Sequence, residues 1–316
     1  MNKNKRFMLG MAALLLTFGL VLVGCPTDGG DDGGSTAGED LPAATGANEL
    51  SGKTYFQDNR KTEFTANGTY KKSEPARNDD GYVLTTDGKY TYTEIENGTY
   101  SWDTASKKVV LKPAKIIVWG ESGPTLQDAA GYRQPVQAVI DDYKDKLGQD
   151  ALNQQLDKEG FSSESAYIDY IVSEAFANTT FTYVFAASGA ALLMLEELPS
   201  SVGTNELDKK TFQDNDSTDG TYSFSGTDYT YTNSSYSSDN ATGTYAWNTE
   251  RKRVYLKQTT IDGKTNVQYF ESLSDDDVDN RYNNANDYHA DRTNSQFADV
   301  DYYPYNITEK TIGYDH

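Results

Sequence analysis

One segment of the chain occurs twice, and this duplication constrains the fold more than any other feature. Residues 98–112 read GTYSWDTASKKVVLK and align without a gap on residues 243–257, which read GTYAWNTERKRVYLK. Further blocks match in the same order: NELSGKTYFQDN with NELDKKTFQDN, residues 68–70 with 220–222, and residues 90–93 with 229–232. Several matched blocks in one order indicate a duplicated unit. The sequence therefore predicts two domains, a first module over residues 48–199 and a second module over residues 205–316.

The repeated segment has the pattern of a β-hairpin. Tyr100 and Trp102 share one face of a strand, a polar turn follows, and Val109 and Leu111 share one face of the next strand. This period of two on both arms is typical of paired strands. Both copies also end in a predicted hairpin, over residues 181–195 in the first and 302–314 in the second.

Helices are predicted between the strands, mainly in the first module. Its insertion, at about residues 124–178, has apolar residues at helical spacing: Val136, Val139, Ile140, Tyr143 and Leu147. Pro135 is expected in the first turn of this helix. A second helix is predicted over residues 149–158 and ends at Gly160, and a third begins after Ser162 or Ser163. The second module has a shorter, acidic segment at residues 271–297, where a helix is also predicted.

The N-terminus has the features of an export signal. Residues 3–6 are mostly basic, residues 7–23 are apolar, and Gly24 precedes Cys25, the only cysteine of the chain. The sequence LVGC at residues 22–25 resembles the bacterial lipobox, in which the cysteine is acylated after the signal is cleaved. We therefore expect a signal peptide over residues 1–24 and a membrane anchor at Cys25; a permanent spanning helix is the alternative. Residues 25–47 are rich in Gly and Asp, which predicts a flexible tether.

The two modules resemble the lipocalin-like modules of lipoproteins from Gram-negative bacteria, and most closely those of spirochaetes such as treponemes. The resemblance is carried by residues 50–54, Phe64, residues 68–70, residues 98–102 and residues 109–111. It implies a mainly β fold with a small antiparallel barrel in each module, from which the helical insertion departs. It also implies a place in the bacterial cell envelope, anchored by lipid to a membrane, on the periplasmic or surface face of the outer membrane.

The charge argues against nucleic acid as a partner, because the formal net charge is −20 and phosphate backbones are repelled. Gly52-Lys53-Thr54 and Gly263-Lys264-Thr265 end like a P-loop but lack its first glycine, and Asp262-Gly263 is better explained as a hairpin turn. No HExxH or GxSxG motif is present, so neither an enzyme nor a cofactor is predicted.

The sequence gives little support for a metal site. His289 and His316 are isolated in the sequence and are expected at the solvated surface. The segment at residues 275–280 resembles the start of a calcium loop. Asn280 and Asn286 replace the glycine and glutamate that such a loop requires, so a solvated acidic segment is the preferred interpretation and no metal site is predicted.

Five aromatic residues recur at matching strand positions and are the candidates for a ligand pocket: Tyr92, Trp102, Tyr183, Tyr231 and Trp247. They form either packed cores or the lining of a pocket. The first hypothesis is a non-enzymatic, lipid-anchored protein whose barrels bind a small hydrophobic or glycan-like ligand. The alternative is a surface module for protein contacts, as in an adhesin or an envelope-assembly factor, with packed and ligand-free barrels. Besides the membrane at Cys25, the expected partner is thus a small ligand or another protein.

Overall fold

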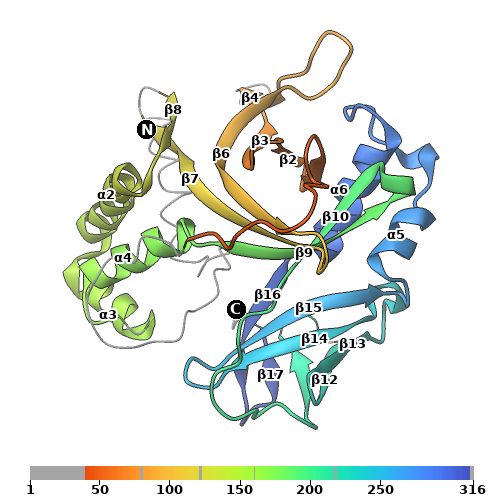
Figure 1. Cartoon of the computed structure of the whole chain (residues 1–316). Helices are drawn as coiled ribbons and strands as arrows, with labels where there is room; N and C mark the ends of the chain where they lie inside the picture. The colour runs from red at the N-terminus through yellow and green to blue at the C-terminus, as the bar shows by residue number, and fades with distance from the viewer. Residues whose placement is uncertain are drawn as a thin grey trace.

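The computed structural model describes residues 40–78, 81–120, 123–159, 161–215, 217 and 219–313. It confirms a mainly β protein with two closed barrels and a helical insertion in the first module (Figure 1). The predicted signal peptide, Cys25, most of the predicted tether, Gly160 and His316 lie outside the described residues. Within these residues, no helix is both long and apolar enough to cross a membrane.

Seven strands close the first barrel, in the order β6-β3-β2-β1-β10-β9-β7, with β7 paired back to β6. They are β1 (Thr54–Gln57), β2 (Arg60–Phe64), β3 (Thr69–Pro75), β6 (Tyr92–Asp103), β7 (Lys108–Gly120), β9 (Thr179–Ala186) and β10 (Ala191–Glu196). A short ribbon of β4 (Arg77–Asn78) and β5 (Gly81–Tyr82) lies between β3 and β6, and β8 (Gly123–Gln127) extends the sheet beside β7.

The second barrel has the same strand order without the additional strands. It consists of β11 (Thr211–Asp214), β12 (Gly220–Ser225), β13 (Asp228–Asn233), β14 (Ala241–Asn248), β15 (Arg253–Ile261), β16 (Val300–Asn306) and β17 (Thr311–Ile312). Each barrel closes by a parallel pairing of its first and last strands. In the first barrel this pairing aligns Tyr55 with Leu192, and in the second it aligns Gln213 with Thr311.

The repeated segment forms the predicted hairpin in both barrels. Trp102 is aligned with Val109 between β6 and β7, and Trp247 is aligned with Val254 between β14 and β15. The predicted matches of residues 68–70 with 220–222 and of residues 90–93 with 229–232 are wrong, because residues 229–232 lie on β13, the counterpart of β3. Tyr70 pairs with Phe64 and Tyr229 pairs with Phe224, so the counterpart of Tyr70 is Tyr229 and not Tyr222. Alternating Thr and Tyr occur on neighbouring strands, and a period of two alone does not distinguish one strand from the next.

The helical insertion comprises α2 (Ala129–Leu147), α3 (Gln149–Glu159) and α4 (Glu164–Ala175). The third predicted helix begins as expected, because the Ser163 hydroxyl accepts a hydrogen bond from the Ala166 amide. The first helix begins earlier than predicted, at a cap where Asp128 Oδ1 accepts from Gly131 N. Pro135 therefore lies inside α2 rather than in its first turn. The side chains of the three helices form a core of their own: Val136, Ile140, Leu152, Leu156, Tyr167, Ile168 and Ile171.

The second module also contains helices, α5 (Asn266–Ser272) and α6 (Ala285–Phe297), between β15 and β16. Helix α6 packs on β1 and β10 of the first barrel, on the side opposite to α2–α4 (Figure 1). Short 3₁₀ turns occur at Ala187–Gly189, Ser237–Asp239 and Asp275–Asp277. The surface prediction for His289 is wrong, because its position on α6 places it against Phe270 with only 6% of the residue exposed.

Two smaller sequence features can be followed in the structure. Asp262 and Gly263 both have positive φ values, 48° and 71°, and form a tight turn between Ile261 and Lys264, but the chain continues into α5 and not into the second strand of the predicted hairpin. In the acidic segment, the Asp279 carboxylate accepts hydrogen bonds from the Arg281 guanidinium at 2.6 and 2.9 Å. No group of three or more His, Cys, Asp and Glu side chains in the described part of the chain is arranged to hold a metal ion.

Candidate functional site

One end of each barrel is closed by the chain that precedes the first strand. Trp102 Nε1 donates to the carbonyl oxygen of Gly46 at 3.2 Å, and Trp247 Nε1 donates to that of Gly203 at 3.1 Å. Thr45 also forms a bridge with Asp103, so the end of the predicted tether belongs to the first barrel. The two tryptophans thus attach the crossing chain to the closed ends of the barrels.

The repeated Asn-Glu-Leu triplet completes this closed end. Asn48 donates its amide to the Tyr100 hydroxyl at 2.9 Å, and Glu49 accepts from Tyr183 at 3.1 Å and pairs with Lys107. The counterparts in the second barrel are Asn205 with Tyr245, and Glu206 with Tyr305 and Lys252. Leu50 and Leu207 are completely buried beneath these networks. The triplet therefore recurs because it closes a barrel.

Aromatic rings fill the interior of the second barrel. Tyr231 packs on Tyr222 with ring centroids 4.7 Å apart, and its hydroxyl donates to Asp214 at 3.1 Å. The buried core of this barrel contains Leu207, Phe212, Phe224, Tyr229, Tyr245, Val254, Leu256, Tyr305 and Ile312. Trp247 and Tyr231 lie against this core. In this barrel, the predicted pocket residues pack with the protein's own side chains.

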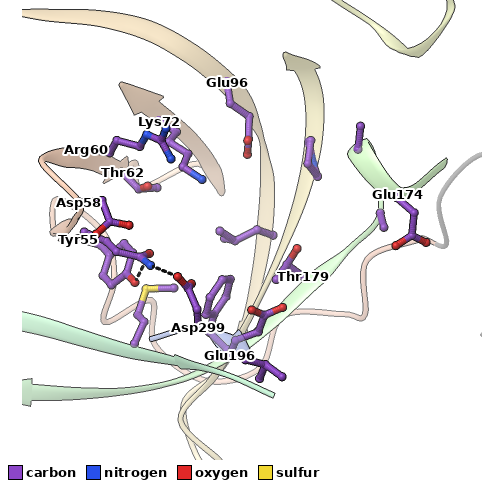
Figure 2. Close-up of a pocket in the computed structure, with 18 of the residues that line it drawn as sticks. Tyr55, Asp58, Arg60, Thr62, Lys72, Glu96, Glu174, Thr179, Glu196 and Asp299 are labelled. Carbon is purple, nitrogen blue, oxygen red and sulfur yellow. Dashed lines mark hydrogen bonds between the residues drawn. The ribbon is translucent and has the colours of Figure 1, made fainter. Parts of the chain in front are cut away.

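The open end of the first barrel contains a cavity of about 580 Å³ (Figure 2). Its apolar part is formed by inward-facing side chains of five strands: Tyr55, Tyr70, Leu111, Phe181 and Met194. Most of these side chains are also part of the first barrel's core. The end of α4 and the start of β16 complete the wall, so both modules and the insertion contribute to it.

The polar wall of the cavity is mainly acidic. Its carboxyl groups come from the first module and from the start of β16: Asp58, Glu96, Glu174, Glu196, Asp299 and Asp301. Its cationic side chains are Arg60 and Lys72. Tyr70 donates its hydroxyl to Glu96 at 2.6 Å, and Gln57 donates its amide to Asp299 at 2.7 Å. The cavity wall therefore combines apolar side chains with ionisable ones.

Burial changes the acidity of three of these carboxyl groups. Desolvation, reinforced by the negative charge of Asp299, raises the pKa of Glu196 to about 8. The same two causes raise the pKa of Asp301 to about 6, and desolvation also raises the pKa of Asp299, although both residues keep exposed surface. At neutral pH Glu196 is thus largely protonated. Carboxyl groups with such raised pKa values in a cavity are typical of functional sites.

None of the five aromatic residues predicted from the sequence lines this cavity. Trp102 and Tyr183 lie at the closed end of the same barrel, and Tyr231 and Trp247 lie in the second barrel. Tyr92 lies beside the cluster of Phe56, Tyr90 and Tyr282 where the modules meet, with Lys61 Nζ 4.7 Å from its ring centroid. Trp102 and Tyr183 therefore share the core of the first barrel. Tyr231 and Trp247 share the core of the second barrel, and Tyr92 belongs to neither.

Sequence reasoning missed the cavity residues, although one signal was present. In β10, Leu192, Met194 and Glu196 occupy alternate positions, so a glutamate stands where the period of two predicts a core residue. An ionisable residue at such a position is costly unless a partner is present, and so it indicates a site. Asp299 and Asp301 have no comparable signal, since they reach the cavity from another module.

No family model, no curated protein and no solved structure matches the chain.

Proposed function

We propose that this chain is a non-enzymatic lipoprotein of the bacterial envelope, anchored at Cys25, whose first barrel binds a small ligand with an apolar body and a polar head. The cavity at the open end of the first barrel is the observation that carries the proposal. Its volume of about 580 Å³ lies within the range of about 300–1,000 Å³ that is usual for small-molecule sites.

The chemistry of the wall supports a ligand of this kind. Leu111, Phe181 and Met194 offer an apolar surface inside the barrel, and Asp299 and Asp301 of the second module bring carboxyl groups to the same cavity. A barrel of this size holds a single small ligand rather than a channel. An apolar body would be buried against the apolar side chains, while the polar head would contact the ionisable ones.

The anchor is supported by the sequence at residues 22–25, LVGC, after an apolar run. It would hold the barrels at a membrane surface, where an amphipathic small molecule is available. The spirochaete-like character of the modules is part of the same proposal and rests on the repeated blocks of the two modules.

A protein-contact role is the second candidate, and the second barrel favours it. Its interior is filled by its own aromatic side chains, such as Phe212, Phe224 and Tyr245. Exposed Tyr236 adds an aromatic contact to its surface. Tyrosine gives large contact area at low conformational cost.

Native mass spectrometry of residues 40–316 tests the binding function. This segment contains every described strand of both barrels and the contacts described between the modules. After incubation with an envelope lipid extract, we expect an added mass that disappears on denaturation. Thr179→Trp, which fills the cavity, should abolish the added mass, whereas Thr125→Trp on exposed β8 should retain it. A bare mass, or equal loading of both variants, would contradict the proposal.

A further inference from the structure

We propose that the ligand of this cavity has a cationic head, an organic ammonium or a similar group, that binds beside Glu196, Asp299 and Asp301. This inference rests on the ligand-binding function proposed above and names its ligand class. It is carried by the apolar cavity, by the charges on its wall and by the position of one deeply buried carboxyl group.

The wall of the cavity carries more acidic than basic side chains. Six carboxyl groups line the cavity against two cationic side chains, Arg60 and Lys72. In Figure 2, Arg60 and Lys72 lie together on one side of the cavity, and Glu196 and Asp299 lie close together on the other. Arg60 also faces Glu74 at 3.8 Å. The region beside Glu196 and Asp299 is therefore the acidic side of the cavity.

Glu196 is buried at the cavity wall without a paired cation among the described residues. The residue is only 7% exposed, yet it lines the cavity. The backbone amide of Val300 donates to its carboxyl group, and Lys72 and Lys257 act on it only from a distance. Within the described residues, no lysine or arginine forms an ion pair with it. A buried carboxylate without a cation is unfavourable, so Glu196 is largely protonated in the empty cavity, and a bound ammonium would supply the charge that favours its ionised form.

The lining of the cavity favours an organic cation over a metal ion. A metal ion requires several ligating side chains at close range, and the described residues contain no such group of three or more. Leu111, Phe181 and Met194 give the same cavity an apolar lining. This combination fits an organic cation whose apolar body enters the barrel. Since Asp299 and Asp301 belong to the second module, the head would bind between the modules.

Three probes with the same tail distinguish the classes of head: decylammonium, decan-1-ol and decanoate. Isothermal titration calorimetry of residues 40–316 at pH 7.5, below the aggregation concentration of each probe, measures their affinities. We expect decylammonium to bind about tenfold more tightly than decanol, and decanoate to bind most weakly. Equal affinity for decylammonium and decanol, or preference for decanoate at Arg60 and Lys72, would overturn the cationic head and leave the binding function intact. If no probe binds, the proposed binding function itself fails.

Two adjacent glutamates supply a matched pair of variants. Glu196→Gln should reduce decylammonium affinity about tenfold and leave decanol affinity unchanged. Glu197→Gln is the control, because the Glu197 carboxylate pairs with Lys108 at 2.7 Å and does not line the cavity. Asp301→Asn, a second cavity variant, should also weaken decylammonium selectively and serves if Glu196→Gln does not fold. Equal decylammonium affinity in the cavity variants and the control would contradict the proposal.

Discussion

The side-chain amide of Asn294, on helix α6 of the second module, donates to the carbonyl oxygen of Phe56 on β1 of the first barrel at 2.8 Å. The same amide donates to the carbonyl of Leu192 on β10 at 3.2 Å, and its oxygen accepts from Met194 N at 3.2 Å. Asn294 thus bridges the two strands whose short parallel pairing closes the first barrel. Helix α6 also caps the β1–β2 turn, because Asp291 accepts from Asn59 N at 2.8 Å. The second module therefore completes the first barrel.

Asn294→Ala should destabilise the whole protein, because the substitution leaves buried backbone groups of β1 and β10 without partners. The expected loss in the free energy of unfolding is about 3 kcal/mol, measured by guanidinium denaturation. Gln296→Ala, at an exposed position of the same helix, is the control and should change stability by less than about 0.5 kcal/mol. Equal stability of the two variants would show that Asn294 does not support the barrel closure.

Stability should fall as the pH rises from about 5 to about 8. Below its ordinary pKa of 4.5, Glu196 is protonated in both the folded and the unfolded chain. Above that pH only the unfolded chain releases the proton, because burial raises the pKa of Glu196 to about 8 in the folded state. Each unit of pKa difference corresponds to about 1.4 kcal/mol. Asp291, whose pKa is raised by burial to about 6, acts in the same direction.

Glu196→Gln isolates the contribution of Glu196 to this pH dependence. Thermal unfolding followed from pH 5 to pH 8.5 should show a smaller fall in melting temperature for Glu196→Gln than for the unmodified chain. Glu197→Gln should retain the full fall, since its carboxylate lies in a surface ion pair with Lys108. The same slope in all three proteins would refute a raised pKa at Glu196.

Gly98→Ala and Gly243→Ala should destabilise the two barrels to a similar extent. A Cβ at Gly98 would lie 2.1 Å from the Lys112 carbonyl oxygen, and one at Gly243 would lie 2.1 Å from that of Lys257. Backbone in a paired strand has little room to move, so we expect a loss of about 3 kcal/mol for each. Gly52→Ala, with φ of +73° but open space around the Cβ, should cost only about 1 kcal/mol, which chemical denaturation can compare directly.

Cys25→Ala should release the protein from the membrane fraction and abolish labelling with radioactive palmitate, since the thiol is the proposed site of acylation. Thr27→Ala, which leaves the LVGC sequence intact, should remain labelled and membrane-bound. If Cys25→Ala stays in the membrane and resists alkaline extraction, the apolar run is a spanning helix and the lipid-anchor proposal is wrong.

Local pattern was sufficient for much of the fold. The hairpin that places Trp102 opposite Val109 follows from alternation along each arm, and the start of α4 follows from Ser163 as its cap. Both features depend on residues that are close together in the sequence, so the local pattern of side chains is enough to predict them. The start of α2 was misplaced because Pro135 suits a first turn, whereas Asp128 forms the actual cap.

The candidate site was less predictable, because its residues meet only after the chain has folded. Glu196 showed a weak signal as an ionisable residue on a core-facing position of β10. Asp299 and Asp301 showed none, since their proximity to Glu196 depends on how the second module packs against the first. The burial of His289 on α6 has the same origin.

The sequence by itself determined that this protein is a duplicated β structure, with a repeated hairpin, a repeated Asn-Glu-Leu triplet and a helical insertion. These properties are local or are repeated as blocks, so the order of side chains expresses them directly. Only the tertiary structure decided that α6 completes the first barrel and that Glu196, Asp299 and Asp301 share one cavity. Contacts between segments far apart in the chain have no period in the sequence, and packing of the modules alone brings these carboxyl groups together.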